Sequence, residues 1–147
     1  MLNPNVLNKM SELELLVVGC GDSMVRLKSE WSRIITAIKT LGPVLPLTRN
    51  EYVVDEKNGV YSNVKIIGSM GFVLDDLINL RLFISHWHQG FFVREKITNG
   101  ESQSLQFFDR HGKAIHKIYL LELSDEKIFD TFISTFTSRD QLNALSK

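Results

Sequence analysis

The spacing of hydrophobic residues along the chain changes twice, and these changes predict its layout. Apolar residues recur at helical spacing up to about residue 42, alternate with polar ones to about residue 122, and return to helical spacing up to about residue 146. We therefore expect a single domain over residues 1–147, with helices over about 11–42, a sheet over about 44–122 and helices over about 124–146. Helices segregated at the two ends of a sheet predict the α+β class.

The expected helices have recognisable starts. Ser11 with Glu14 forms a capping box, and Ser29 is expected to cap the next helix. Ser138 with Gln141 predicts a helical restart near the end of the chain. The residues expected to be buried are Trp31, Ile34, Ile35, Ile38 and Leu41 in the second helix and Ile128, Phe129, Phe132, Ile133 and Phe136 in the third.

The alternating region predicts a run of strands joined by short turns. Asn58-Gly59 and Asn99-Gly100 are strong hairpin signals because both residue types tolerate positive φ, and His111-Gly112 is a weaker one. Short links favour pairing of sequential strands, so the expected sheet is an antiparallel meander. The strands are expected over residues 44–48, 51–55, 60–67, 72–74, 80–84, 90–96, 104–109 and 113–122.

One of these strands, residues 80–84, mixes apolar residues with a permanent charge. Alternation sends Leu80, Leu82 and Ile84 to one face, which is expected to be core, and Arg81 and Phe83 to the other. Arg81 is either an ordinary surface arginine on an edge strand or part of a site. In the second case the aromatic ring and the five fixed N–H donors suit a flat, anionic ligand.

Composition and charge exclude several classes of function. Seventeen basic residues balance seventeen acidic ones, so no net field favours nucleic acid or an anionic membrane. The single cysteine, Cys20, excludes an intramolecular disulfide, is read as structural or incidental, and fits a reducing, cytoplasmic setting. No apolar run is long enough for a signal sequence or a spanning helix, so we expect no membrane insertion.

The histidines are the other candidates for chemistry. His86 and His88 would share a face on a strand and chelate a metal there, but not in a turn, and no carboxylate or cysteine stands at matching spacing. A hydrogen-bonded structural pair is therefore favoured over a metal site. His111 is read as a turn residue and His116 as a surface or sheet-face residue. The usual nucleophile, phosphate-loop, dinucleotide and zinc-protease motifs are absent.

Three stretches together resemble the bacterial haemin-degrading factor family, whose members are also called haemin-transport proteins. They are LTRNEYVV (residues 47–54), LRLFISHWHQGFFV (80–93) and SLQFFDRHGKAIHKIYL (104–120). The similarity extends from about residue 21 to about residue 136. Family members are usually about twice as long and consist of two homologous halves, and this sequence is similar to the N-terminal half.

The resemblance implies a haem (iron protoporphyrin IX) site. In the family an arginine of the LRLF motif lies on the distal side of the haem, and a histidine from the start of the second half ligates the iron. Arg81 occupies the position of that arginine, for which the resemblance implies a catalytic role, and Phe83 is the motif's aromatic residue that would line the pocket. His86 and His88 are then candidate substitute axial ligands, and the expected partner is a second homologous half or a second copy of the chain.

The function implied by the resemblance is cytoplasmic haem binding for haem utilisation and iron acquisition. The alternative is a carrier without catalytic activity that hands haem, or another planar ligand, to a partner. Catalysis stays open at this point: it would be an oxidative or reductive degradation of haem, similar to that of a haem oxygenase, and would require the second half. A bare scaffold half, with its ligand site wholly in other residues, is the remaining hypothesis.

Overall fold

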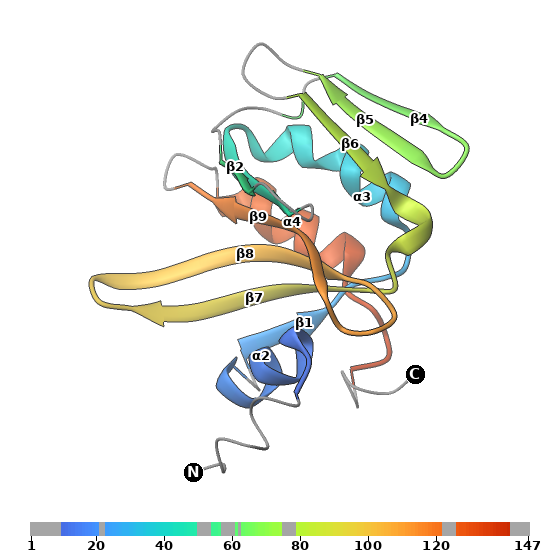
Figure 1. Ribbon diagram of the computed structural model, residues 1–147. Helices are drawn as coiled ribbons and strands as arrows, with labels where there is room; N and C mark the ends of the chain where they lie inside the picture. Colours follow the sequence, from blue (N-terminus) through green and yellow to red (C-terminus); the bar gives the residue numbers. More distant parts are fainter. Residues whose placement is uncertain are drawn as a thin grey trace.

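The computed structural model describes residues 10–20, 23–49, 54–56, 61, 63–74, 79–121 and 126–141, and these confirm the α+β class. Helices and antiparallel strands are arranged in the layers seen in Figure 1. The helical elements are α2 (Glu12–Cys20), α3 (Trp31–Ala37), the 3₁₀ turns η2 (Ile38–Leu41) and η3 (Ile84–His86), and α4 (Glu126–Phe136). The strands are β1 (Met24–Arg26), β2 (Val44–Arg49), β3 (Val54–Glu56), β4 (Val64–Ile67), β5 (Met70–Leu74), β6 (Asn79–Phe83), β7 (Gln89–Ile97), β8 (Gly100–Phe108) and β9 (Ala114–Leu120).

The strands form two sheets, where the sequence predicted one meander. A six-stranded sheet has the order β1-β7-β8-β9-β2-β3, and a three-stranded sheet has the order β4-β5-β6. Each contains a meander of sequential strands, as expected, and the pairings of β1 with β7 and of β2 with β9 are non-local. The three-residue strand β1 was not predicted, because so short a segment has no readable alternation.

The predicted hairpin at Asn99-Gly100 is confirmed, and so is the turn at His111-Gly112. Strands β7 and β8 pair from Gln89 with Phe108 to Ile97 with Gly100. Gly112 links β8 to β9 with φ +75°, a conformation that glycine adopts without strain. The predicted turn at Asn58-Gly59 lies outside the described residues.

The first two helices follow their sequence signals with one exception. The capping box is present, because the Ser11 backbone N–H donates to the Glu14 carboxylate and the Glu14 N–H donates to Ser11 Oγ, each at 3.1 Å. The residue that precedes α3 is Glu30 rather than the predicted cap Ser29, and it makes no side-chain capping bond. In the described part of the chain, no helix combines the length and the apolar character that crossing a bilayer requires.

The core lies on both faces of the six-stranded sheet. On one face α2 packs against Phe91, Val93 and Phe108. On the other face lie α3 and α4, and the three-stranded sheet covers the far side of α3 (Figure 1). The aromatic residues of α4 that were expected to be buried are buried, whereas Ile128 is 42% exposed.

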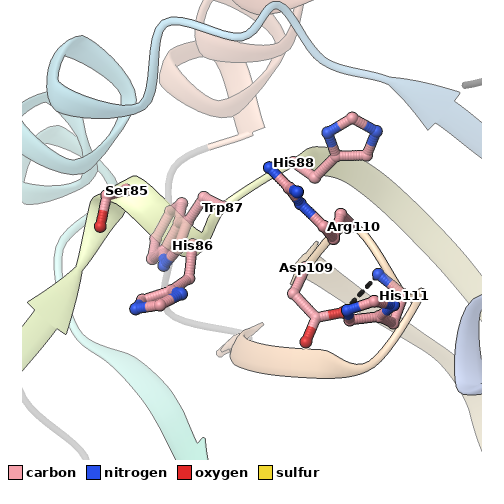
Figure 2. Close-up of a pocket in the computed structure, with 7 residues that line it drawn as sticks. All are labelled: Ser85, His86, Trp87, His88, Asp109, Arg110 and His111. Atoms are coloured by element: carbon pink, nitrogen blue, oxygen red, sulfur yellow. Dashed lines mark hydrogen bonds between the residues drawn. The ribbon is translucent and has the colours of Figure 1, made fainter.

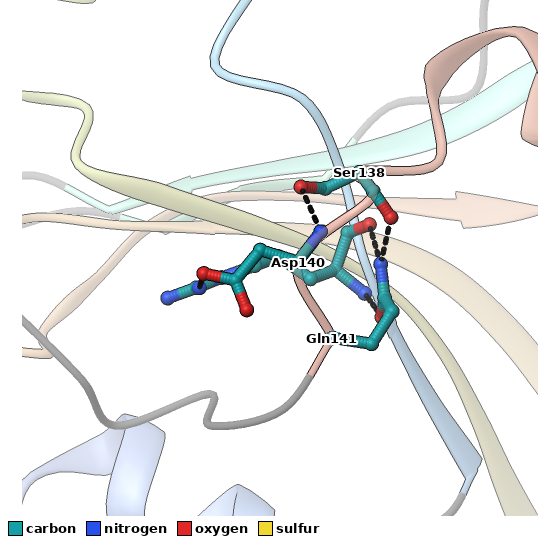
Figure 3. A network of polar contacts seen from close by, with 4 residues as sticks. Ser138, Asp140 and Gln141 are labelled. Carbon is teal, nitrogen blue, oxygen red and sulfur yellow. Dashed lines mark hydrogen bonds and ion pairs between the residues drawn. The ribbon is translucent and has the colours of Figure 1, made fainter.

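The chain after α4 runs beside β1 and does not restart a helix through Gln141. The Gln141 side-chain amide accepts a hydrogen bond from the Arg26 N–H at 2.7 Å and donates one to the Arg26 carbonyl at 2.8 Å (Figure 3). The Ser138 N–H also donates to the Arg26 carbonyl, at 2.9 Å, so the backbone after α4 and the Gln141 amide together cover the open edge of β1. Residues 142–146 of the expected last helix lie outside the described residues.

His116 is buried in the core, although its sequence position favoured the surface or a sheet face. Its Nε2 lies 2.8 Å from the Tyr61 hydroxyl oxygen, and its ring lies beside those of Trp87 and Phe107 at centroid distances of 5.8 and 6.3 Å. Desolvation lowers the pKa of His116 to about 3, and a hydrogen bond with the backbone of Leu47 acts in the opposite direction. His116 is therefore neutral in the folded protein, and its polar ring is satisfied by Tyr61 and the backbone.

Gly90 should tolerate no side chain. A Cβ atom at this position would lie 2.8 Å from the Phe107 ring and 2.9 Å from the Trp31 ring, both of which are buried. We expect Gly90→Ala to lower the free energy of unfolding by about 1–3 kcal/mol, because it overpacks the core. Chemical denaturation measures this, and Gly19→Ala is the matched control: its Cβ meets nothing within 4 Å. Equal stability of the two variants would contradict the packing.

Burial of neutral His116 should make the protein acid-sensitive. The pKa of His116 is about 3 when folded and about 6.5 in the unfolded chain, so between these values only the unfolded chain takes up the proton. Stability should therefore fall as pH drops from about 6.5 towards 3, by about 1 kcal/mol per pH unit. Denaturation midpoints across this range measure the slope. His116→Gln should flatten the slope, and His88→Gln, at an exposed position, should leave it unchanged.

Candidate functional site

The two faces of β6 separate as the alternation predicts. Leu80 and Leu82 are buried, at 7% and 3% exposure, in the core shared with α3. Arg81 and Phe83 point to the opposite side, where Arg81 is exposed and Phe83 is 54% exposed. A phenylalanine with half its surface in water loses hydrophobic free energy, so this face of the strand is a candidate contact surface.

Strand pairing extends this surface across the whole three-stranded sheet. Arg81 pairs with Phe72, which pairs with Lys65, and Phe83 pairs with Met70, which pairs with Ile67. Phe72 and Met70 are half-buried, and Ile67 is 66% exposed. We call this surface the outer face, and it consists of Lys65, Ile67, Met70, Phe72, Arg81 and Phe83.

Four of these six residues were not predicted from the sequence. The alternation in residues 64–67 and 70–74 was visible, but it did not indicate which strands are neighbours of residues 80–84. Register across a sheet depends on non-local hydrogen bonds, so only the structure groups Lys65, Ile67, Met70 and Phe72 with the two predicted residues.

Beyond β6 the chain is held by a buried tryptophan. The Trp87 ring, 7% exposed, stacks on Phe107 at 4.3 Å between ring centroids and packs at 6.0 Å against Trp31. The Ile84 N–H donates to the Ser69 carbonyl at 2.9 Å, which fixes the end of β6 to the turn between β4 and β5. The histidines on either side of Trp87, His86 and His88, are both exposed.

Two segments far apart in the sequence enclose a pocket of about 470 Å³. Its lining is Ser85, His86, Trp87, His88, Asp109, Arg110 and His111, and we call it the loop pocket (Figure 2). The His88 N–H donates to the Phe108 carbonyl at 2.8 Å and so joins the two segments. His86 also contacts the outer face, because its ring meets the Phe83 ring edge-on at 6.3 Å. Two histidines of the predicted set thus lie in this pocket, and Arg81 and Phe83 lie outside it.

The loop pocket is not a ready metal site. Within the described residues, no group of three or more histidine, cysteine, aspartate and glutamate side chains converges on one point. Structural metal sites in proteins usually need four such ligands, so the interpretation of His86 and His88 as a dedicated chelate gains no support here. Burial, with Glu95 as a smaller cause, raises the pKa of the Cys20 thiol, which keeps this cysteine in its less reactive form.

Comparison with solved structures finds the same fold in haem proteins. Holo-PhuS, a heme-binding protein from Pseudomonas aeruginosa, is 36% identical with a TM-score of 0.84, over 97% of this chain and 42% of that one. ChuS, an E. coli heme oxygenase, is 28% identical with a TM-score of 0.84, over 97% and 42%. ChuX, at 14% identity and a TM-score of 0.73, shares the fold over 88% of this chain and 84% of its own.

Curated relatives and a family model also match haemin proteins. The hemin transport protein HmuS of Yersinia pestis is 34% identical over 128 residues, which are 86% of this chain and 37% of HmuS. HemS of Yersinia enterocolitica is 35% identical over 142 residues, 93% of this chain and 41% of HemS. The chain therefore spans less than half the length of either relative. The model of the haemin-degrading HemS.ChuX domain matches residues 9–136. The chain belongs to the family of haemin-degrading HemS.ChuX domains.

Proposed function

We propose that the chain binds haem on the outer face and serves haem utilisation and iron acquisition in the cytoplasm. The observation that carries this proposal is the exposure of Arg81 and Phe83 on one apolar sheet surface. The names of the relatives support it: PhuS is a heme-binding protein, HmuS a hemin transport protein and ChuS a heme oxygenase.

The outer face fits the chemistry of haem. A porphyrin is a broad apolar plate, and a three-stranded sheet whose strands lie about 4.8 Å apart offers a flat surface roughly 10 Å wide between the outer two. Phe72, Phe83, Met70 and Ile67 supply its apolar contacts. Aromatic rings contribute most to such contacts because each buries a large area at little conformational cost.

In this proposal Arg81 acts on the distal side of the bound haem. Haem supplies an iron atom whose open face takes a small ligand, and the polarity of the surrounding side chains tunes the reactivity of that ligand. The Arg81 guanidinium would offer planar N–H donors to a small ligand on that face and would stabilise negative charge there. Phe83, two residues along the same strand, excludes water from the same side.

A histidine that would ligate the iron is absent from the six residues of the outer face. His116 is not a candidate iron ligand, since it is buried and hydrogen-bonded to Tyr61. We propose a histidine from a second homologous half or a second copy of the chain, docked over the outer face. His86 is the substitute that the described residues offer, because its ring lies beside Phe83, and His88 is a more distant one.

Transfer of haem to a partner is the second candidate function. The described residues provide only one wall of a haem site, so bound haem would stay accessible from the other side. Such an open site suits a carrier, whereas degradation of haem would require a second wall that excludes water and supplies an iron ligand.

Haemin titration followed by the Soret band tests the site. Phe83→Ala should weaken haemin binding about tenfold, because it removes a large apolar contact. Arg81→Ala should keep the fold and change the absorbance spectrum, because the distal donor is lost. Arg94→Ala, at another exposed strand arginine, is the matched control and should behave like the parent. A parent without saturable binding, or variants indistinguishable from it, would contradict the proposal.

Reductant and oxygen added to the haemin complex distinguish a carrier from an enzyme. We expect the 147-residue chain to keep its Soret band, because the described residues supply one wall of the site. Absorbance at the Soret maximum, together with product analysis, measures the outcome. Loss of the band with one product formed per haem would favour degradation, and apo-myoglobin capturing the haem intact would favour transfer.

A further inference from the structure

We propose that the loop pocket is an oxyanion site, which takes a carboxylate or phosphate group. The site stands on its own geometry and does not require the haem site proposed above. Its volume of about 470 Å³ lies in the range of small-molecule sites. One source of the oxyanion is a free small molecule, and the other is a carboxylate of a planar ligand on the neighbouring outer face.

Side chains that can donate hydrogen bonds line the pocket from both segments. In Figure 2 the Arg110 side chain extends from the turn between β8 and β9 towards the backbone at Trp87 and His88. A guanidinium offers five N–H donors in a planar fork, which matches a carboxylate or phosphate group. His86, His88 and His111 also line the pocket, each imidazole can offer an N–H donor, and all three residues are exposed.

The acidic side chain among the residues that line the pocket is already engaged by backbone donors. Asp109 Oδ1 accepts hydrogen bonds from the backbone N–H groups of His111 at 2.8 Å and Lys113 at 3.0 Å. These bonds stabilise the turn, so Asp109 acts as a structural element of the pocket. Arg110 and the three histidines remain to face an incoming anion.

The pocket is rigid enough to bind without large rearrangement. The bond from the His88 N–H to the Phe108 carbonyl joins its two sides, and Trp87 is fixed by its stack on Phe107. The Asp109 N–H donates to the Lys113 carbonyl at 3.0 Å, which closes the turn that carries Arg110. The backbone that carries the donors is therefore fixed before the anion arrives, which limits the entropy lost on binding.

A titration with inorganic phosphate and with acetate, followed by backbone amide NMR, tests the site. We expect saturable shifts at residues 85–88 and 109–113. Arg110→Ala should weaken phosphate binding by about tenfold or more, since a charge-assisted hydrogen bond is lost. Lys113→Ala is the matched control: it removes an exposed cation of the same turn that does not line the pocket, and should stay within about twofold of the parent.

The proposal is overturned if neither segment shows chemical shift changes, or if Arg110→Ala and Lys113→Ala lose the same amount of phosphate binding. Unfolding midpoints show whether both variants fold.

Titrations with haemin and with haemin dimethyl ester distinguish the two sources of the oxyanion. Weaker haemin binding in Arg110→Ala, with unchanged ester binding, assigns the oxyanion to a haem carboxylate. Phosphate binding that needs Arg110, with both porphyrins unaffected, assigns a free anion. If phosphate binds and haemin does not, the proposed function fails and the oxyanion site stands.

Discussion

The packing of Trp87 against Phe107 and Trp31 is the contact on which both candidate surfaces depend. The stack on Phe107, at 4.3 Å between ring centroids, anchors the end of the three-stranded sheet to the large sheet. Gly90 makes it possible, because any side chain there would meet the rings of Trp31 and Phe107. The outer face ends at Phe83, just before this anchor, and the loop pocket is built around it. Aromatic rings in close contact hold a position well, since small displacements lose many contacts.

The two surfaces next to this anchor differ in chemistry. The outer face is apolar, apart from two cations that flank Phe72, whereas the loop pocket is polar and rich in imidazole and guanidinium donors. The edge contact between Phe83 and His86 is where they meet. A plate-shaped molecule and a small anion would each find suitable partners within one continuous region of the protein.

Local signals predicted a large part of the fold. The capping box at Ser11, the hairpin between β7 and β8 and the alternation along β6 each depend on residues close in sequence, and each is confirmed. The division into two sheets was not predicted, because β2 pairs with β9 across the sequence. The burial of His116 was missed for the same reason: its partner Tyr61 is 55 residues away, and nothing local to residue 116 indicates it.

The sequence by itself determined the family, the α+β class and the outward-facing positions Arg81 and Phe83 of β6, because motifs and period-two alternation depend on neighbouring residues. Only the tertiary structure decided what surrounds them. Phe72 lies beside Arg81, and Lys65 beside Phe72, because of the strand register, and the packing of Trp87 brings Arg110 and His86 to the lining of one pocket. Register and packing join residues that are distant along the chain, and the spacing of side chains in one segment carries no information about either.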